Sequence, residues 1–148
     1  MQVRSPLDPG TKASTALTSG GVILIGIGLY FVFIRPALLP EDARFMAMTL
    51  PEIRDKFPQL LLWLARVFWV MGGYMVATGL LTCYVARTVF RSRTPGSAWV
   101  AALSGMTSIG LMVTVNFLID SDFKWLLLAC TLPWLVALWL YKYERRSP

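Results

Sequence analysis

Four long blocks of apolar residues alternate with shorter polar stretches along the chain. The blocks cover residues 16–34, 60–86, 97–119 and 123–141. At ~1.5 Å rise per residue, a helix of about 20 residues crosses the roughly 30 Å hydrocarbon core of a bilayer. Backbone amides in lipid must pair within their own segment, which helices allow. The pattern predicts an all-α integral membrane four-helix bundle that forms a single domain over residues 1–148.

The first block carries no charged residue and is followed by Arg35-Pro36. Proline disfavours helix at the residue before it, so the first helix is expected to end there. A cleaved signal peptide is the competing interpretation, because Arg4 and Lys12 precede the block. The block is longer than the usual ~7–15-residue apolar region of a signal, so we expect a retained helix. In the fourth block, Pro133 removes one backbone donor and is expected to bend the helix.

The connection over residues 35–59 is long and is expected to contain short amphipathic helices. Thr49 and Glu52 have the spacing of a capping box, in which each side chain bonds the other residue's backbone N–H. Leu50, Ile53 and Phe57 then recur at helical spacing, and residues 41–48 have the composition of a second short helical turn. These helices are expected either at the membrane interface or as an ordered cap on the bundle.

Composition narrows the chemistry that the chain can carry. The apolar fraction is 56%, the net charge is +6, and the charge lies beside apolar blocks, so a nucleic-acid partner is not expected. Histidine is absent, which removes the commonest metal ligand. Cys83 and Cys130 lie inside apolar blocks, where small buried hydrophobes are the simplest interpretation. No metal site, cofactor or catalytic residue is predicted, and an enzyme is the least favoured reading.

Basic residues suggest how the bundle is oriented. Arg87, Arg91 and Arg93 crowd into one short loop on the same side as both termini. Lysine and arginine in short loops favour the cytoplasmic side. We therefore expect a multi-pass protein of the cell inner membrane, with the N- and C-termini in the cytoplasm and residues 35–59 outside.

Small residues recur along the predicted helices. Gly21 and Gly28 lie seven apart on one face of the first helix, and Gly72, Gly73 and Gly79 thin the second. Helices in lipid associate through close packing at such residues, because lipid tails are as apolar as leucine. These positions are expected to form helix contacts.

Polar residues near the outer helix ends form the candidate site. Charged residues inside a span are costly and usually functional or paired. Three interpretations stay open: Arg66 extends to the headgroups, or an Arg66–Asp120 pair with Asn116 locks the second and third helices, or the cluster lines a cavity for a lipid headgroup, quinone or small substrate. The candidate residues are Arg66, Asn116, Asp120, Asp122, Lys124, Glu41 and Asp42.

Three segments carry a resemblance to known proteins. They are residues 28–40 (GLYFVFIRPALLP), 64–81 (LARVFWVMGGYMVATGLL) and 116–122 (NFLIDSD). The chain resembles small four-helix bacterial inner-membrane proteins of the DoxX-like set and related families of unknown function. The resemblance implies the four-helix fold and assigns no functional residue.

Two functions are expected from these features. The first is a non-catalytic accessory, assembly or structural subunit that packs against other membrane proteins or against itself, with membrane lipids around it. The second is a protein that binds a lipid, a quinone or another small molecule in a pocket near the outer ends of the second and third helices. A membrane enzyme is the third and weakest.

Overall fold

The computed structural model describes residues 9–143, and every regular element there is helical. The tails, with Arg4, Arg145 and Arg146, lie outside the described residues. The helices are α1 (Pro9–Phe33), α2 (Pro40–Phe45), α3 (Leu50–Lys56), α4 (Pro58–Val85), α5 (Ser97–Gly105), α6 (Leu111–Leu118), α7 (Lys124–Ala129) and α8 (Leu132–Tyr143). Two π-helical turns, η1 (Ala86–Phe90) and η2 (Met106–Gly110), extend α4 and join α5 to α6.

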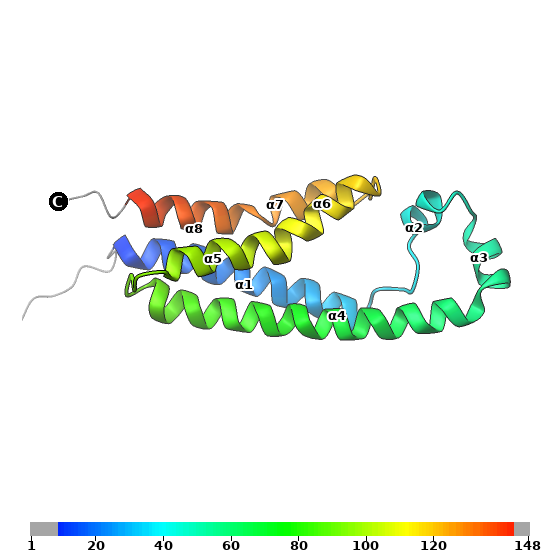
Figure 1. Ribbon diagram of the computed structural model, residues 1–148, viewed down its shortest axis with the longest axis horizontal. Helices are drawn as coiled ribbons and strands as arrows, with labels where there is room; N and C mark the ends of the chain where they lie inside the picture. Colours follow the sequence, from blue (N-terminus) through cyan, green and yellow to red (C-terminus); the bar gives the residue numbers. More distant parts are fainter. Residues whose placement is uncertain (1–8, 144–148) are drawn as a thin grey trace, which may run out of the picture.

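Four helical stretches are long and apolar enough to cross a membrane: Lys12–Phe33, Pro58–Phe90, Ser97–Leu118 and Lys124–Tyr143. The four long apolar helices predicted from the sequence are therefore confirmed. They run side by side along one long axis (Figure 1). We call the end with the turn over residues 91–96 the termini end, and the end with α2, α3 and the turn over residues 119–123 the loop end.

Glycines bring α1 and α4 into close contact along their length. Gly28 faces Gly72 and Gly21 faces Gly79, so closely that a Cβ atom on any of the four would lie 2.6–2.8 Å from the carbonyl oxygen of the opposite helix. Seven residues from Gly21 and Gly79, toward the termini end, the Ser14 hydroxyl donates to the Ala86 carbonyl at 2.7 Å. Contacts repeat every seven residues on both helices, which is the spacing of a left-handed antiparallel pair. The predicted helix contact is confirmed for Gly21, Gly28, Gly72 and Gly79, and it is wrong for Gly73, where a Cβ atom would meet nothing within 4 Å.

The remaining core lies toward the termini end. Trp134 of α8 is 3% exposed, and its ring fills the space over Gly20 of α1 and Gly105 of α5. Nearer the turn, Phe90 stacks against Tyr141 with ring centroids 4.6 Å apart. Three of the four apolar stretches, α1, α5 and α8, therefore meet around one tryptophan, and α4 joins them through η1.

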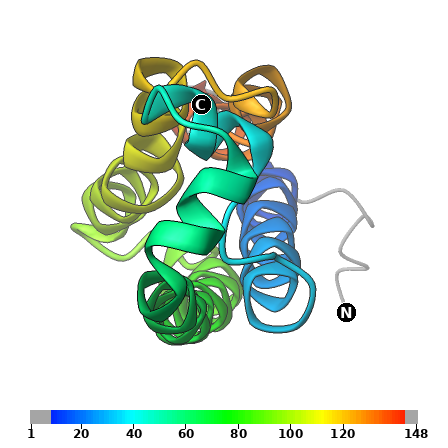
Figure 2. The ribbon, with the colours of Figure 1, turned by 90° about the vertical axis from the view of Figure 1, so that its right-hand side faces the viewer.

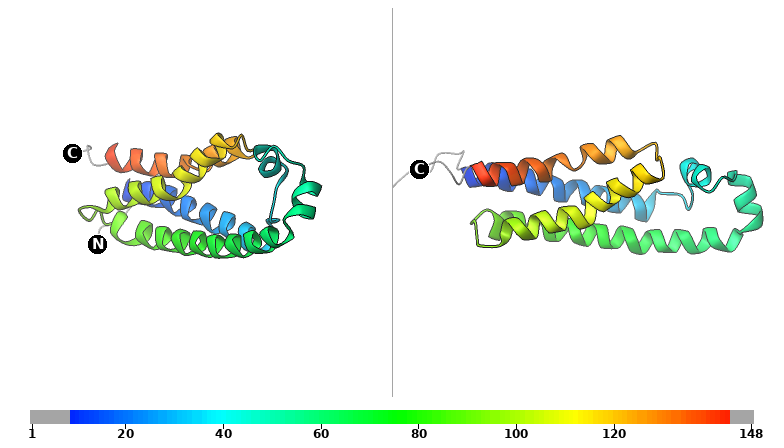
Figure 3. Two further views of the ribbon diagram at one scale, coloured as in Figure 1. Left: turned by 45° about the vertical axis from the view of Figure 1, so that its right-hand side comes forward. Right: turned by 45° about the horizontal axis from the view of Figure 1, so that its top comes forward.

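Toward the loop end the helices separate into two pairs. The third stretch changes direction through η2, and α6 runs beside α7 rather than beside α4 (Figures 1 and 3). The fourth stretch is interrupted between Ala129 and Leu132, with Pro133 in the first turn of α8. A bend was predicted at Pro133, and the structure has a short break just before it. The only buried residues of α4 itself, Gly72, Gly79 and Thr82, include the two glycines that meet α1. Much of the side of α4 toward α6 is therefore uncovered.

Short helices cross the loop end of the bundle. Seen along the long axis, α2 and α3 lie over the ends of the other helices (Figure 2). The predicted capping box is present: the Thr49 hydroxyl accepts the Glu52 N–H, and Glu52 accepts the Thr49 N–H at 2.8 Å. Ile53 is 1% exposed and anchors α3 to the bundle. Both predicted short helices are thus confirmed.

Alanine at two neighbouring glycines of α4 gives a matched test of the α1–α4 contact. A Cβ atom at Gly72 would lie 2.6 Å from the Gly28 oxygen, whereas one at Gly73 would meet nothing within 4 Å. We expect Gly72→Ala to lower the free energy of unfolding by about 1–3 kcal/mol. Gly73→Ala should be neutral or stabilising by up to about 1 kcal/mol. Denaturant unfolding in a mild detergent measures both, and equal effects would contradict the close contact.

Candidate functional site

An apolar cavity of about 920 Å³ occupies the space between the two helix pairs. Its walls come from α1, α4, α6 and α7, and its loop end lies under α2. Along α1 the lining residues run from Ile23 to Phe31, which is roughly 12 Å at ~1.5 Å per residue, and the lining continues past the end of the helix to Arg35. Most of its lining is apolar, with methionine prominent, and methionine adapts to ligands of irregular shape. The methionines are Met71, Met75 and Met112.

The cavity opens sideways between α4 and α6. Tyr74 of α4 lines it and is 73% exposed, and Leu111 and Val115 of α6 line it while at least half exposed. The substantial contacts of α4 with the third stretch are with α5, near the termini end. A molecule can therefore reach the cavity from the flank of the bundle.

Three charged residues line the loop end of the cavity: Arg35, Glu41 and Asp42. The Arg35 guanidinium bonds Asp42 Oδ2 at 3.2 Å and the Pro36 carbonyl at 2.9 Å. Its flat face stacks on Phe68 of α4 at 3.6 Å from the ring centroid, a cation–π contact. Arg35 was expected only to mark the end of the first helix. It lines the cavity because Asp42, seven positions later, is brought back to it by the connection between α1 and α2.

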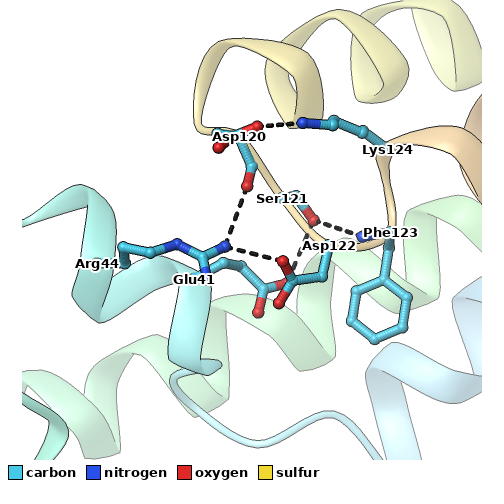
Figure 4. A network of polar contacts seen from close by, with 7 residues as sticks. All are labelled: Glu41, Arg44, Asp120, Ser121, Asp122, Phe123 and Lys124. Carbon is cyan, nitrogen blue, oxygen red and sulfur yellow. Dashed lines mark hydrogen bonds and ion pairs between the residues drawn. The ribbon is translucent and has the colours of Figure 1, made fainter.

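α2 is tied to the turn between α6 and α7 by a polar bridge (Figure 4). Glu41 is 3% exposed, and its Oε1 accepts the Ser121 hydroxyl at 3.2 Å. Arg44 donates to Asp122 Oδ1 at 2.9 Å and to the Asp120 carbonyl at 3.1 Å. The Arg44–Asp122 pair is exposed and contributes little free energy, whereas the buried Glu41–Ser121 bond closes the end of the cavity.

The α6–α7 turn has a defined backbone geometry. Asp120 has φ of +54°, and the Ser121 N–H donates back to the Asn116 carbonyl at 2.9 Å. This is a Schellman cap, in which Asp is one of the few non-glycine residues tolerated. The Asp120 carboxylate lies outside the helix and pairs with the Lys124 ammonium. That ammonium holds the pKa of Asp120 below its usual range, with a smaller contribution from the charge of Arg44.

Arg66 does not join this cluster, and the Arg66–Asp120 pair, one of the three interpretations left open by the sequence, does not form, since Asp120 pairs with Lys124. Its side chain is exposed, beside Trp63, Val70 and Tyr74, on the surface of α4. Continuing the register in which Gly28 faces Gly72 and Phe31 contacts Phe68 places Arg66 level with the end of α1. Arg66 and Arg35 therefore lie at a similar height along the bundle.

The other predicted residues divide between the cavity and its rim. Asn116 lines the cavity, and its side-chain amide donates to the Met112 carbonyl of its own helix at 2.8 Å. Glu41 and Asp42 line it as well. Asp122 and Lys124 belong to the polar bridge and the turn outside it. The cavity thus combines a long apolar body with a charged and hydrogen-bonding end.

The described residues contain no group of three or more His, Cys, Asp or Glu side chains placed to hold a metal ion. Comparison of the chain with protein-family models, with curated proteins and with solved structures finds no match. The resemblance to DoxX-like proteins therefore stays an expectation.

The pKa of Asp120 gives a test of the turn. A carboxylate whose pKa is lowered in the folded state stabilises the fold at pH values above its ordinary pKa. That stabilisation is lost as the pH falls through the lowered pKa. Lys124→Gln should raise the pKa of Asp120 toward its ordinary range, because the ammonium is its main stabiliser. Arg44→Gln should raise it less. Carbon-detected NMR titration of the carboxyl measures both, and a larger effect of Arg44→Gln would contradict this arrangement.

Proposed function

We propose that the protein crosses a bilayer four times and binds one amphiphilic molecule of the membrane, such as a lipid or a quinone, without catalysis. The observation that carries this is the apolar cavity of about 920 Å³ with charged residues at one end. Ligand sites are typically concave and mostly apolar, with a few polar groups that orient the ligand. The sideways opening between α4 and α6 would face lipid and admit a hydrophobic chain.

The proposed membrane position follows from the charged residues. Arg35 and Arg66 lie at a similar height, and Asp120 and Lys124 lie in the turn at the loop end. This level would coincide with the headgroups on one side, where charged side chains are tolerated. The polar end of the cavity would then lie among the headgroups and its apolar body among the acyl chains. Arg87 of η1 and Arg91 and Arg93 of the following turn are basic residues at the termini end. They support our proposal that this end faces the cytoplasm and that the protein lies in a bacterial inner membrane.

Blocking the cavity from Gly26 tests the proposal. Gly26 lines the cavity, and a Cβ atom there meets nothing within 4 Å, so a larger side chain enters the free space without disturbing the α1–α4 contact. The probe is a diacylglycerol with a diazirine in one acyl chain, incorporated into nanodiscs and cross-linked by light. We expect label on Met75 and Met112 in the wild type, and a several-fold loss in Gly26→Phe.

Gly73→Phe is the matched control, because Gly73 is an equally open position of α4 that does not line the cavity. It should leave the labelling of Met75 and Met112 unchanged. Label confined to outward-facing residues such as Trp69 and Leu81, in all three proteins, would contradict binding in the cavity.

A second function, an accessory subunit that packs beside another membrane protein, is supported by a different surface. α4 extends past the end of α1 at the loop end (Figure 1). Its first turns, together with α2 and the residue before α4, expose large apolar side chains beyond the level of Arg35. These are Phe45, Met46, Phe57, Leu60, Leu62 and Trp63. Large exposed apolar patches outside the bilayer core mark interaction sites.

Purification tests this second function. We expect a stoichiometric membrane partner to remain bound in mild detergent and to be lost in Leu62→Glu with Trp63→Glu. The control is Asp55→Lys, on the exposed side of α3, which should retain the partner. Glutamate at Leu80 and Leu81 would instead place charge deep in a span, so those positions do not serve as a control. Recovery of the wild-type chain alone, as measured by mass spectrometry of the intact assembly, would contradict an accessory role.

A further inference from the structure

The charge at the loop end of the cavity indicates which amphiphile it takes. Two carboxylates, Glu41 and Asp42, and one guanidinium, Arg35, line this end, which leaves one net negative charge. The Arg44 guanidinium bonds Asp122 and the Asp120 carbonyl and does not line the cavity (Figure 4). Its charge also acts on Glu41, but more weakly than on Asp122. The charged residues that line the cavity therefore carry one net negative charge next to a long apolar body.

Arg35 is poorly placed to recruit an anionic headgroup. Its side chain is 9% exposed, one Nη bonds Asp42 and the other bonds the Pro36 carbonyl. Its face is covered by Phe68 at 3.6 Å. A phosphate or sulfate that approached Arg35 would also approach the carboxylates of Asp42 and Glu41. Nearby like charges repel strongly where water is scarce.

The two carboxylates retain unused acceptor atoms. Glu41 Oε1 accepts the Ser121 hydroxyl, and Asp42 Oδ2 accepts both Arg35 and the Leu39 N–H. Within residues 9–143, neither Glu41 Oε2 nor Asp42 Oδ1 accepts a hydrogen bond. A carboxylate that is 97% buried and bonded by a single neutral hydroxyl is electrostatically incomplete, and a cation would complete it.

Aromatic rings surround the same end of the cavity. Tyr30 and Phe31 of α1, Phe68 of α4 and Phe123 beside α7 all contribute to its lining. Phe31 and Phe68 already contact the Arg35 guanidinium, whereas Tyr30 and Phe123 make no such contact within residues 9–143. Aromatic faces attract ammonium and other organic cations, and the attraction is strongest when water is excluded. Carboxylate and aromatic side chains together are the lining that suits a positively charged head on an apolar body.

We infer that the ligand is a cationic amphiphile, whose ammonium or comparable organic cation lies against Glu41 and Asp42 and whose apolar part occupies the cavity toward Met75 and Met112. This inference rests on the proposed function of amphiphile binding and specifies the charge of the ligand. The same chemistry is supplied by an aminolipid of the bilayer or by a free hydrophobic cation.

A pair of isosteric ions of opposite charge tests the inference. Tetraphenylphosphonium and tetraphenylborate are added to the full-length protein in uncharged, phosphatidylcholine nanodiscs, and each is scored by displacement of the neutral diazirine lipid from Met112. Comparing variants in the same bilayer cancels the different membrane partitioning of the two ions. We expect Glu41→Gln, which retains an acceptor for Ser121, to weaken displacement by tetraphenylphosphonium roughly tenfold. Tetraphenylborate should displace the label equally well or better.

Two further variants complete this experiment. Asp42→Asn should weaken the phosphonium in the same direction, which keeps the test decisive if Glu41→Gln folds poorly. Asp55→Asn removes a carboxylate from the exposed side of α3 and should change neither ion. The inference would be overturned if neither Glu41→Gln nor Asp42→Asn changed displacement by the phosphonium. It would also be overturned if the borate displaced the label more strongly than the phosphonium in the wild type and either variant weakened displacement by the borate.

Lipid analysis distinguishes the two sources of the cation. Native mass spectrometry that shows an aminolipid retained by the wild type and lost in Glu41→Gln supports a bilayer ligand. An empty cavity that still discriminates the phosphonium supports a free amphiphile, whereas a retained anionic lipid would overturn the inference. Failure of the neutral lipid to label Met112 at all would refute the proposed function, so the two failures are distinguishable.

Discussion

Close contact between α1 and α4 is the constraint on which the rest of the structure depends. Gly28 against Gly72 and Gly21 against Gly79 leave no room for a single additional carbon atom, and Ser14 adds a hydrogen bond to Ala86. In a bilayer this kind of close packing, rather than exclusion of water, holds helices together. The face of α4 that carries Gly72 and Gly79 packs on α1 over this length, and it is therefore not free to pack on α6. The α1–α4 pair and the α6–α7 pair are accordingly separate at the loop end.

The cavity and the polar bridge are consequences of this separation. Trp134 fixes α1, α5 and α8 at the termini end, and η2 then directs α6 away from α4. α2 spans the resulting opening and is held by Glu41 on Ser121, with Arg44 on Asp122 outside it. The buried Glu41 carboxylate has a structural part, as the acceptor that fastens α2, and we propose that it has a binding part in the cavity below. A charge retained in so apolar a place is costly, and a ligand would offset that cost.

Hydropathy predicted the four apolar helices because their length and lack of charge are local properties of the chain. The Thr49–Glu52 capping box and a distortion of the helix near Pro133 were predictable for the same reason. A pocket near the outer ends of the second and third helices was one of the expectations. The extent and lining of the cavity were not predictable, since they depend on which helices pack together and on the two turns that redirect them. The Arg66–Asp120 pair failed on this point: α4 packs on α1, and Asp120 lies beyond the end of α6 in a cap that pairs it with Lys124. Arg35 was overlooked because its partner Asp42 is brought back to it only by the α1–α2 connection.

A structure from crystals grown in a lipidic mesophase tests most directly whether the α1–α4 contact leaves a ligand cavity beside α6, since it shows helix contacts and bound molecules in a bilayer. The account predicts that α4 lies on α1 through Gly28 and Gly72, that α6 stays apart from α4 at the loop end, and that elongated density fills the space between them. Direct packing of Tyr74 against Leu111, with α4 and α6 in contact along their length and no space beneath α2, would contradict it.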